Sequence, residues 1–273
     1  MNKPTFSSFD YKLLEQVNTK TDCSISIELG LNGLSYAIFN SQQLVGIEWY
    51  NTPLSNLEDT IRNSHWLQKE FNTSHICSTT SKATLIPTSL FDEEKKAQYL
   101  AFNHKKVEQL DVLNDTIEPI DSMCVYGVSK AEKDIVSTFF SKSTFSHFST
   151  KYIPFFLTEN KNIQSQKMLV NVTYNQLYIS VLQNSNLAFF NVFRFSSAHD
   201  CTYYILFVCE QLKLNPETLL LELSGNVNKE SEIYQLVYTY IRSVSFRKSQ
   251  QRISPVIEGL ERHSHFPLIH QHL

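Results

Sequence analysis

Two windows of this chain, residues 28–50 and residues 171–193, carry the same pattern of apolar positions, 143 positions apart and without a gap. Ile25, Ile27 and Leu29, which lead into the first window, alternate with polar residues. A period of two is typical of a strand with one buried face. Asn32-Gly33 in the first window and Asn175-Gln176 in the second hold the same place and predict a turn. Each window therefore predicts a three-strand meander, over residues 23–29, 34–39 and 44–50 in the first copy and 168–172, 177–182 and 187–195 in the second.

Helical periodicity follows each meander. Pro53 opens a helix in the first half, and the spacing of Ser129 and Glu132 is that of a capping box, which begins another helix. Ser197 and Asp200 have the same spacing in the second half. The remaining predictions are a surface helix over 92–109, a helix over 230–240, strands over 75–86, 123–128, 218–223 and 243–247, and an irregular strand over 145–157, where Pro154 interrupts the pattern.

This order of elements predicts an α/β protein with mixed sheets, built from two related lobes that face one cleft. The polar stretch 158–166 is the best linker, so the expected domains are an N-terminal lobe over 1–162 and a C-terminal lobe with a tail over 163–273. An alternative is two unrelated α+β domains, in which the repeat is a coincidence of period two.

Composition excludes several classes of protein. A net charge of −3 and a pI near 6.3 give no reason to expect nucleic acid or an anionic membrane as partner. Five widely spaced cysteines indicate free thiols and a reducing, cytoplasmic location. No signal peptide and no apolar run long enough to span a membrane are expected. The basic residues gather most closely in a group that we expect to be solvated, Arg242, Arg247, Lys248 and Arg252.

The second half carries a more specific likeness. The strand exit Arg194-Phe195, the capped helix and the segment Leu214-Asn215-Pro216-Glu217 resemble the pattern of the actin-like ATPase superfamily, which has a duplicated ribonuclease H-like fold. The resemblance is closest to its bacterial branch that contains PilM and FtsA. With the tail His265–Ile269, the chain is similar to a small bacterial family of degenerate actin-like domains of unknown function.

The resemblance implies a site for ATP between the lobes, built on two Asp-x-Gly turns and a Gly-Gly turn near the adenine. The first turn corresponds to Glu28-Leu29-Gly30, where the carboxylate is one methylene longer. The second corresponds to Asn171-Val172-Thr173, where an amide replaces the carboxylate and a β-branched residue replaces glycine. The third corresponds to Ser224-Gly225-Asn226, with one glycine of two. Only six glycines occur in 273 residues, too few to build all three close approaches to a nucleotide.

We therefore expect Glu28, Gly30, Asn171, Thr173, Gly225 and Asn226 to be vestigial nucleotide contacts, with no catalytic residue and with ATP and Mg²⁺ disfavoured as cofactors. The resemblance implies a non-catalytic scaffold that binds an unknown protein partner, as in a PilM-like capture of a peptide. The alternative is an ATP-binding switch or a kinase-like enzyme that uses Glu28.

Two other groups are weaker candidates. The histidines at 263, 265, 270 and 272 form two H-x-H pairs that could chelate zinc or nickel, but residues 266–269 between them favour a segment that docks on a core. Tyr234, Tyr238, Tyr240, Phe246 and the pair Trp49-Tyr50 could include a partner-binding patch, although packing on sheet faces is favoured.

Overall fold

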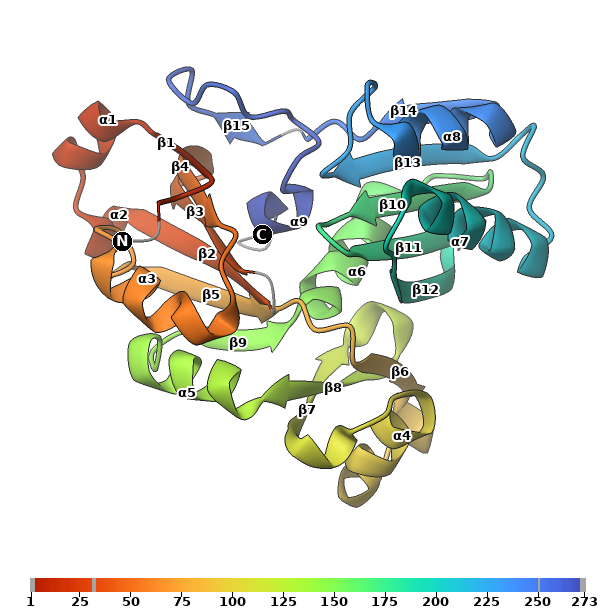
Figure 1. The fold of residues 1–273 in the computed structure, drawn as a ribbon, viewed down its shortest axis with the longest axis horizontal. Coiled ribbons are helices and arrows are strands. Elements are labelled where there is room, and N and C mark those ends of the chain that lie inside the picture. Colours follow the sequence, from red (N-terminus) through yellow and green to blue (C-terminus); the bar gives the residue numbers. More distant parts are fainter. Residues whose placement is uncertain (1–2, 31–32, 250, 271–273) are drawn as a thin grey trace. The chain divides into compact units, whose positions relative to one another are not determined.

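The computed structural model describes residues 3–30, 33–249 and 251–270. The chain forms two compact units, whose elements are labelled in Figure 1. Unit 1 comprises Met1–Phe155, Gln251–Gly259 and Pro267–Leu273, and unit 2 comprises Phe156–Gln250 and Leu260–Phe266. Within the described residues the strands form sheets of seven, five and three members, of which the two larger are mixed.

The seven-stranded sheet of unit 1 is built from β1 (Phe6–Phe9), β2 (Cys23–Gly30), β3 (Gly33–Asn40), β4 (Gln43–Tyr50), β5 (Thr73–Ser78), β9 (Thr144–His147) and β15 (Arg252–Ile253). Its order is β1-β4-β3-β2-β5-β9, and β15 pairs with β4. The meander β2-β3-β4 is antiparallel, whereas β5 and β9 run parallel to β2. The alternation Ile25, Ile27, Leu29 that predicted β2 places these three side chains in the core.

Helices of unit 1 cover this core. Leu57 and Ile61 of α3 and Ile135 of α5 pack in the same hydrophobic cluster as the strands of the meander. Ser129 accepts a hydrogen bond from the Glu132 N–H and begins α5, as its spacing predicted. The helical segments around the sheet are α1 (Tyr11–Gln16), α2 (Thr19–Asp22), the 3-10 turn η1 (Leu54–Asn56), α3 (Leu57–Asn63) and α5 (Lys130–Phe139).

Unit 2 contains the five-stranded sheet and two helices: β10 (Lys167–Val172), β11 (Gln176–Gln183), β12 (Asn186–Arg194), α7 (Ala198–Gln211), β13 (Leu220–Gly225), α8 (Glu232–Tyr240) and β14 (Ser243–Phe246). Its order is β12-β11-β10-β13-β14. Met168 and Val170 of β10 pack with Ile205 and Val208 of α7. The predicted capping box of Ser197 and Asp200 is present at the start of α7.

The two mixed sheets share their topology and their irregularities. In both, an antiparallel meander is followed by two parallel strands. The pairing register shifts between Ile38 and Phe39 in unit 1 and between Val181 and Leu182 in unit 2, at equivalent positions. The next turns also match, because Ser41 and Asn184 both adopt positive φ, 54° and 50°. The predicted relation between the two halves is therefore confirmed in their hydrogen bonding.

A three-stranded antiparallel subdomain interrupts unit 1 between β5 and α5. It has a small core of its own around Leu100, Val107 and Val125. The sequence predictions were incomplete here: the strand expected over 75–86 is two strands of different sheets, the helix expected over 92–109 is shorter, and one strand was not predicted. The elements are β6 (Ala83–Pro87), η2 (Thr88–Leu90), η3 (Glu93–Lys95), α4 (Lys96–Asn103), η4 (Val107–Gln109), β7 (Leu110–Ile117), η5 (Glu118–Ile120) and β8 (Ser122–Ser129).

The irregular strand expected over 145–157 was wrong. After the short strand β9 the chain forms α6 (Phe148–Glu159), with Pro154 inside the helix. Phe148, Tyr152 and Phe156 recur at four-residue spacing and are buried. Burial of this aromatic face outweighs the roughly 3 kcal/mol that an interior proline costs a helix.

The C-terminal region ends, among the described residues, in the short helix α9 (Phe266–His270). Leu268 and Ile269 of this helix are fully buried, as expected for a segment that docks on a core. His270 stacks on Phe155 with ring centroids 4.4 Å apart. In the part of the chain that the structure describes, no helix combines the length and apolarity needed to cross a membrane.

Candidate nucleotide-binding turns

The first candidate turn joins β2 to β3 in unit 1. Glu28 is partly exposed and pairs across the sheet with Ser35 and Cys77. Gly30 ends β2 opposite Gly33, and a Cβ added to Gly30 would lie 2.2 Å from Thr79 Oγ1. The turn thus retains a carboxylate and a glycine, and a larger residue at position 30 would have to displace the Thr79 hydroxyl.

Gly33 shows the same constraint from the other side of this turn. Its φ is +151°, and an added Cβ would lie 2.0 Å from the Tyr50 carbonyl oxygen. A larger residue would therefore force β3 away from the end of β4. Asn32, the other half of the predicted turn dipeptide, lies outside the described residues.

The second candidate turn, between β10 and β11 in unit 2, is closed by its own backbone. Both the N–H and the hydroxyl of Thr173 donate to the Gln176 carbonyl, at 2.9 and 3.0 Å. Asn171 is 2% exposed, and its Oδ1 accepts a hydrogen bond from Ser224 Oγ at 2.9 Å. This buried amide supplies no negative charge for a metal, and the Thr173 N–H is already bonded.

The third candidate is the β13 loop (residues 225–228). Gly225 has a φ of +85°, and an added Cβ would lie 2.0 Å from the Val172 carbonyl oxygen and 3.0 Å from Asn171 Oδ1. The Asn226 N–H donates to the same Val172 carbonyl at 2.7 Å. Glycine is required here because the ends of β10 and β13 approach closely, and the same approach brings Asn171, Gly225 and Asn226 together.

The chain's own tail segment (Leu260–Phe266) lies on the β13 loop. The Gly225 N–H donates to the His263 carbonyl at 2.8 Å. The His263 imidazole lies 4.5 Å from the Phe246 ring, and its Nε2 is 2.6 Å from the Val227 carbonyl and 3.0 Å from Glu261 Oε2. The carboxyl ends of parallel strands are the usual ligand edge of an α/β sheet. In unit 2 this edge is occupied by a peptide of the same chain, a contact that no sequence motif indicated.

The basic group expected to be solvated includes one buried member. Arg247 is 4% exposed and pairs with Glu159 and, at 3.0 Å, with Glu222. Lys167 lies 2.9 Å from the other oxygen of Glu222. The prediction for Arg247 was wrong, because its position after β14 turns it toward two carboxylates rather than toward solvent.

A buried polar cluster in unit 1 was also missed. His147 Nδ1 lies 2.7 Å from Ser149 Oγ and 3.4 Å from Cys124 Sγ, and its Nε2 lies 3.0 Å from the Thr80 carbonyl. Burial lowers the pKa of His147 to about 4 and raises that of the Cys124 thiol to about 12. A neutral imidazole beside a protonated, inaccessible thiol is a structural arrangement rather than a nucleophile and base.

The remaining candidates are the histidine tail and the aromatic residues. No group of three metal-ligating side chains occurs among the described residues, and His272 lies outside them. Tyr50 is 8% exposed and donates to Glu48 at 2.7 Å, so it packs on the sheet, which is the alternative that the sequence favoured. Tyr238 and Tyr240 are 57% and 54% exposed on α8.

Comparison with solved structures shows that the chain has the actin-like ATPase fold. A Bacteroides thetaiotaomicron protein with this fold and unknown function matches with a TM-score of 0.76 and 22% identity, over 85% of this chain and 93% of that one. A PilM–PilN type IV pilus biogenesis complex matches with a TM-score of 0.59 and 10% identity, over 91% and 96%.

The chain belongs to the family described as "Protein of unknown function (DUF3822)", which it matches over residues 15–244. No curated protein matches it significantly. The predicted fold class and the resemblance to a family of actin-like domains are both confirmed.

Proposed function

We propose that this protein is a non-catalytic actin-like scaffold that binds another protein. The observation that carries the proposal is the state of the N–H groups at the ligand edge of unit 2. The amides of Thr173, Gly225 and Asn226 all donate to carbonyls of their own unit. Phosphate cradles depend on backbone N–H groups that point at the ligand, and here those groups are already bonded.

Nucleotide binding would require several of these contacts to be broken together. A ligand on the β13 loop would have to displace the His263 carbonyl and the His263 ring, which packs against Phe246. Asn171 could neither hold a hydrated Mg²⁺ by charge nor turn toward one without leaving Ser224. These costs support a domain in which the fold has been kept and the chemistry has been lost.

The protein-binding part of the proposal is supported by analogy. The PilM structure that resembles this chain was solved as a PilM–PilN complex. Folds alone do not fix function, so the analogy indicates the kind of role, an actin-like domain that holds a partner, and not the partner itself.

Isothermal titration with Mg-ATP tests the loss of chemistry. We expect no heat of binding up to millimolar nucleotide and no release of phosphate. Micromolar binding that Glu28→Gln weakens would instead support an ATP-dependent switch that uses the surviving carboxylate. Affinity purification of the full-length protein from its native cell, followed by reconstitution with each purified candidate, tests for a partner; a chain that forms no complex would contradict the scaffold.

A further inference from the structure

Unit 1 contains a pocket at the amino-terminal ends of β5 and β9 and the carboxyl-terminal end of α5. Its volume is about 710 Å³, within the range of ligand-binding clefts. It lies at the opposite end of the parallel strands from the turn at Gly30, because Gly30 closes the carboxyl end of β2. The pocket is therefore separate from the candidate nucleotide turns.

The floor of this pocket is apolar. Ile25, Ile27, Leu67 and Phe140 line it from the hydrophobic core of unit 1, and each is less than one tenth exposed (2%, 1%, 6% and 7%). An apolar group resting on this floor would be removed from water, which is the main favourable contribution to association.

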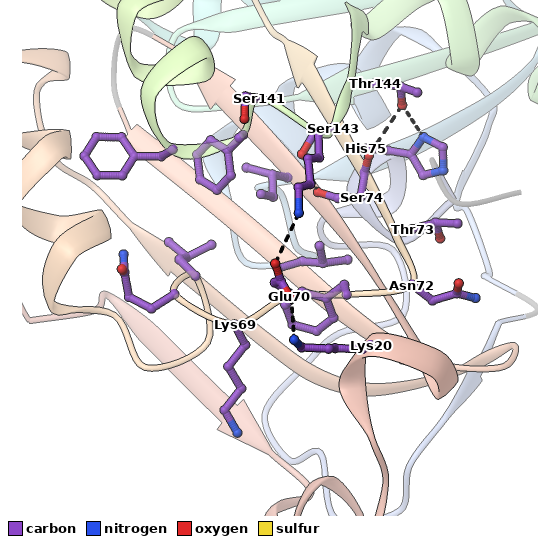
Figure 2. A pocket seen from close by; sticks show the side chains of 18 of the residues that line it. Lys20, Lys69, Glu70, Asn72, Thr73, Ser74, His75, Ser141, Ser143 and Thr144 are labelled. Atoms are coloured by element: carbon purple, nitrogen blue, oxygen red, sulfur yellow. Dashed lines mark hydrogen bonds and ion pairs between the residues drawn. The ribbon is translucent and has the colours of Figure 1, made fainter.

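The rim of the pocket is basic. Lys20 Nζ lies 2.5 Å from one oxygen of Glu70, and Lys142 Nζ lies 3.3 Å from the other. Figure 2 shows the Lys20–Glu70 pair, with the Lys69 side chain extending away from Glu70; the Lys69 ammonium lies 4.4 Å over the Trp66 ring. The lining residues include three lysines and one glutamate, so the rim keeps a positive excess.

We propose that this pocket docks a short acidic segment of a partner protein. One large apolar side chain of the segment covers the floor, and its carboxylates pair with Lys20 and Lys142. The inference rests on the proposed function, since it names the partner's chemistry. A small molecule in a typical site is almost enclosed, whereas the Lys20 and Lys142 side chains are 64% and 88% exposed, which suits a peptide lying across the rim.

A peptide selection tests the inference without knowledge of the partner. Random peptides displayed on phage are selected on the full-length protein, with counter-selection on Ser141→Trp, which blocks the mouth from an exposed position that lines the pocket. We expect enrichment of peptides that place Asp or Glu beside Phe, Leu or Trp. Absence of enrichment, or enrichment of peptides without this composition, overturns the proposal.

Affinities of the best synthetic peptide then separate docking from a structural effect. Lys20→Gln with Lys142→Gln is expected to raise Kd about tenfold, because two partly screened ion pairs are lost. Glu70→Gln is expected to lower Kd, since it removes the internal competitor for the same lysines. The matched control is Lys95→Gln with Lys96→Gln, two ion-paired lysines that do not line the pocket. Equal effects of the pocket and control pairs, or a Kd raised by Glu70→Gln, overturn the proposal.

The peptide selection and the Mg-ATP titration test the docking site and the scaffold proposal independently. Peptides that ignore the pocket would remove this docking site and leave the scaffold proposal intact. Tight Mg-ATP binding would remove the non-catalytic scaffold and leave the measured peptide affinities unchanged.

Discussion

Glu132 offers the sharpest test of the energetics of unit 1. It lies in the first turn of α5, is 4% exposed, and accepts a hydrogen bond from Ser78 Oγ at 2.5 Å. Burial raises the pKa of its carboxyl group to about 7, from a usual value of 4.5, against smaller opposing contributions from Ser78 and the Ser129 cap. The perturbation is Glu132→Gln, which keeps the shape and the acceptor but carries no charge.

The sign and size of the effect follow from proton linkage. Below pH 4.5 the carboxyl group is neutral in both the folded and the unfolded chain, so it imposes no cost. As pH rises from 4.5 to about 7, the Glu132 carboxyl group ionises in the unfolded chain but stays largely protonated in the folded protein. The free energy of unfolding therefore falls over this range. A pKa raised from 4.5 to about 7 corresponds to about 3 kcal/mol. Glu132→Gln is therefore expected to exceed the parent in free energy of unfolding by up to about 3 kcal/mol above pH 7.

His147 makes the parent's own pH profile a poor assay. Its lowered pKa, about 4, means that the folded state is penalised as pH falls from 6.5 toward 4, the reverse of the Glu132 slope. The two slopes offset one another between these limits. The difference between variant and parent isolates Glu132, because His147 is common to both.

The measurement is urea unfolding of parent and Glu132→Gln at several pH values from 4.5 to 8.5. Glu58→Gln serves as the control, an exposed carboxylate paired with Arg62, and should change stability by less than about 0.5 kcal/mol. A variant-minus-parent difference that stays constant with pH would refute the linkage argument. A variant less stable than the parent at pH 8.5 would do so as well.

The remaining predictions concern a buried ion network, a crowded loop and the thiols. Arg247→Ala should lower the free energy of unfolding by about 3 kcal/mol, because Glu159 and Glu222 lose the arginine that pairs with both. Arg242→Ala removes an exposed ion pair, in which the arginine side chain is 73% exposed, and should cost less than about 0.5 kcal/mol. Similar urea midpoints for the two variants would contradict this. Gly225→Ala should destabilise the protein far more than Gly259→Ala, although both glycines have positive φ. The atom nearest to the added Cβ is 2.0 Å away at position 225 and 3.4 Å away at position 259. Equal melting temperatures of the two variants would contradict the steric argument. None of the five cysteines forms a disulfide, all are buried, and burial raises the pKa of the Cys124 thiol. A thiol reagent should therefore label none quickly in the native protein and five after denaturation.

The sequence predicted the parts of the fold that repeat. Strand alternation and capping boxes are local patterns, and they located the two meanders, α5 and α7. Local patterns failed where distant contacts decide: α6 forms despite Pro154 because its aromatic face is buried. The edge strand β1 lies in a polar N-terminal stretch. It is held by backbone pairing with β4, which produces no periodic pattern in the sequence.

The candidate site could likewise be predicted only in part. The resemblance located Asn171, Gly225 and Asn226, which do lie together in unit 2. It gave no indication of His263, because the hydrogen bond to Gly225 comes from a backbone carbonyl, which any residue carries. The burial of Arg247 also depends on partners far along the chain, Glu159 and Glu222.

The three-stranded subdomain of unit 1 has a consequence for how such chains diversify. The chain leaves β5 at Ser78 and returns at α5, and Ser78 is hydrogen-bonded to Glu132 in the first turn of that helix. Domain insertion is tolerated where the two ends of the added segment lie close together. Mutation and recombination can therefore lengthen or trim the subdomain at this junction while the seven-stranded sheet keeps its strand pairing, provided that Cys124 and Asp115 keep their contacts with His147.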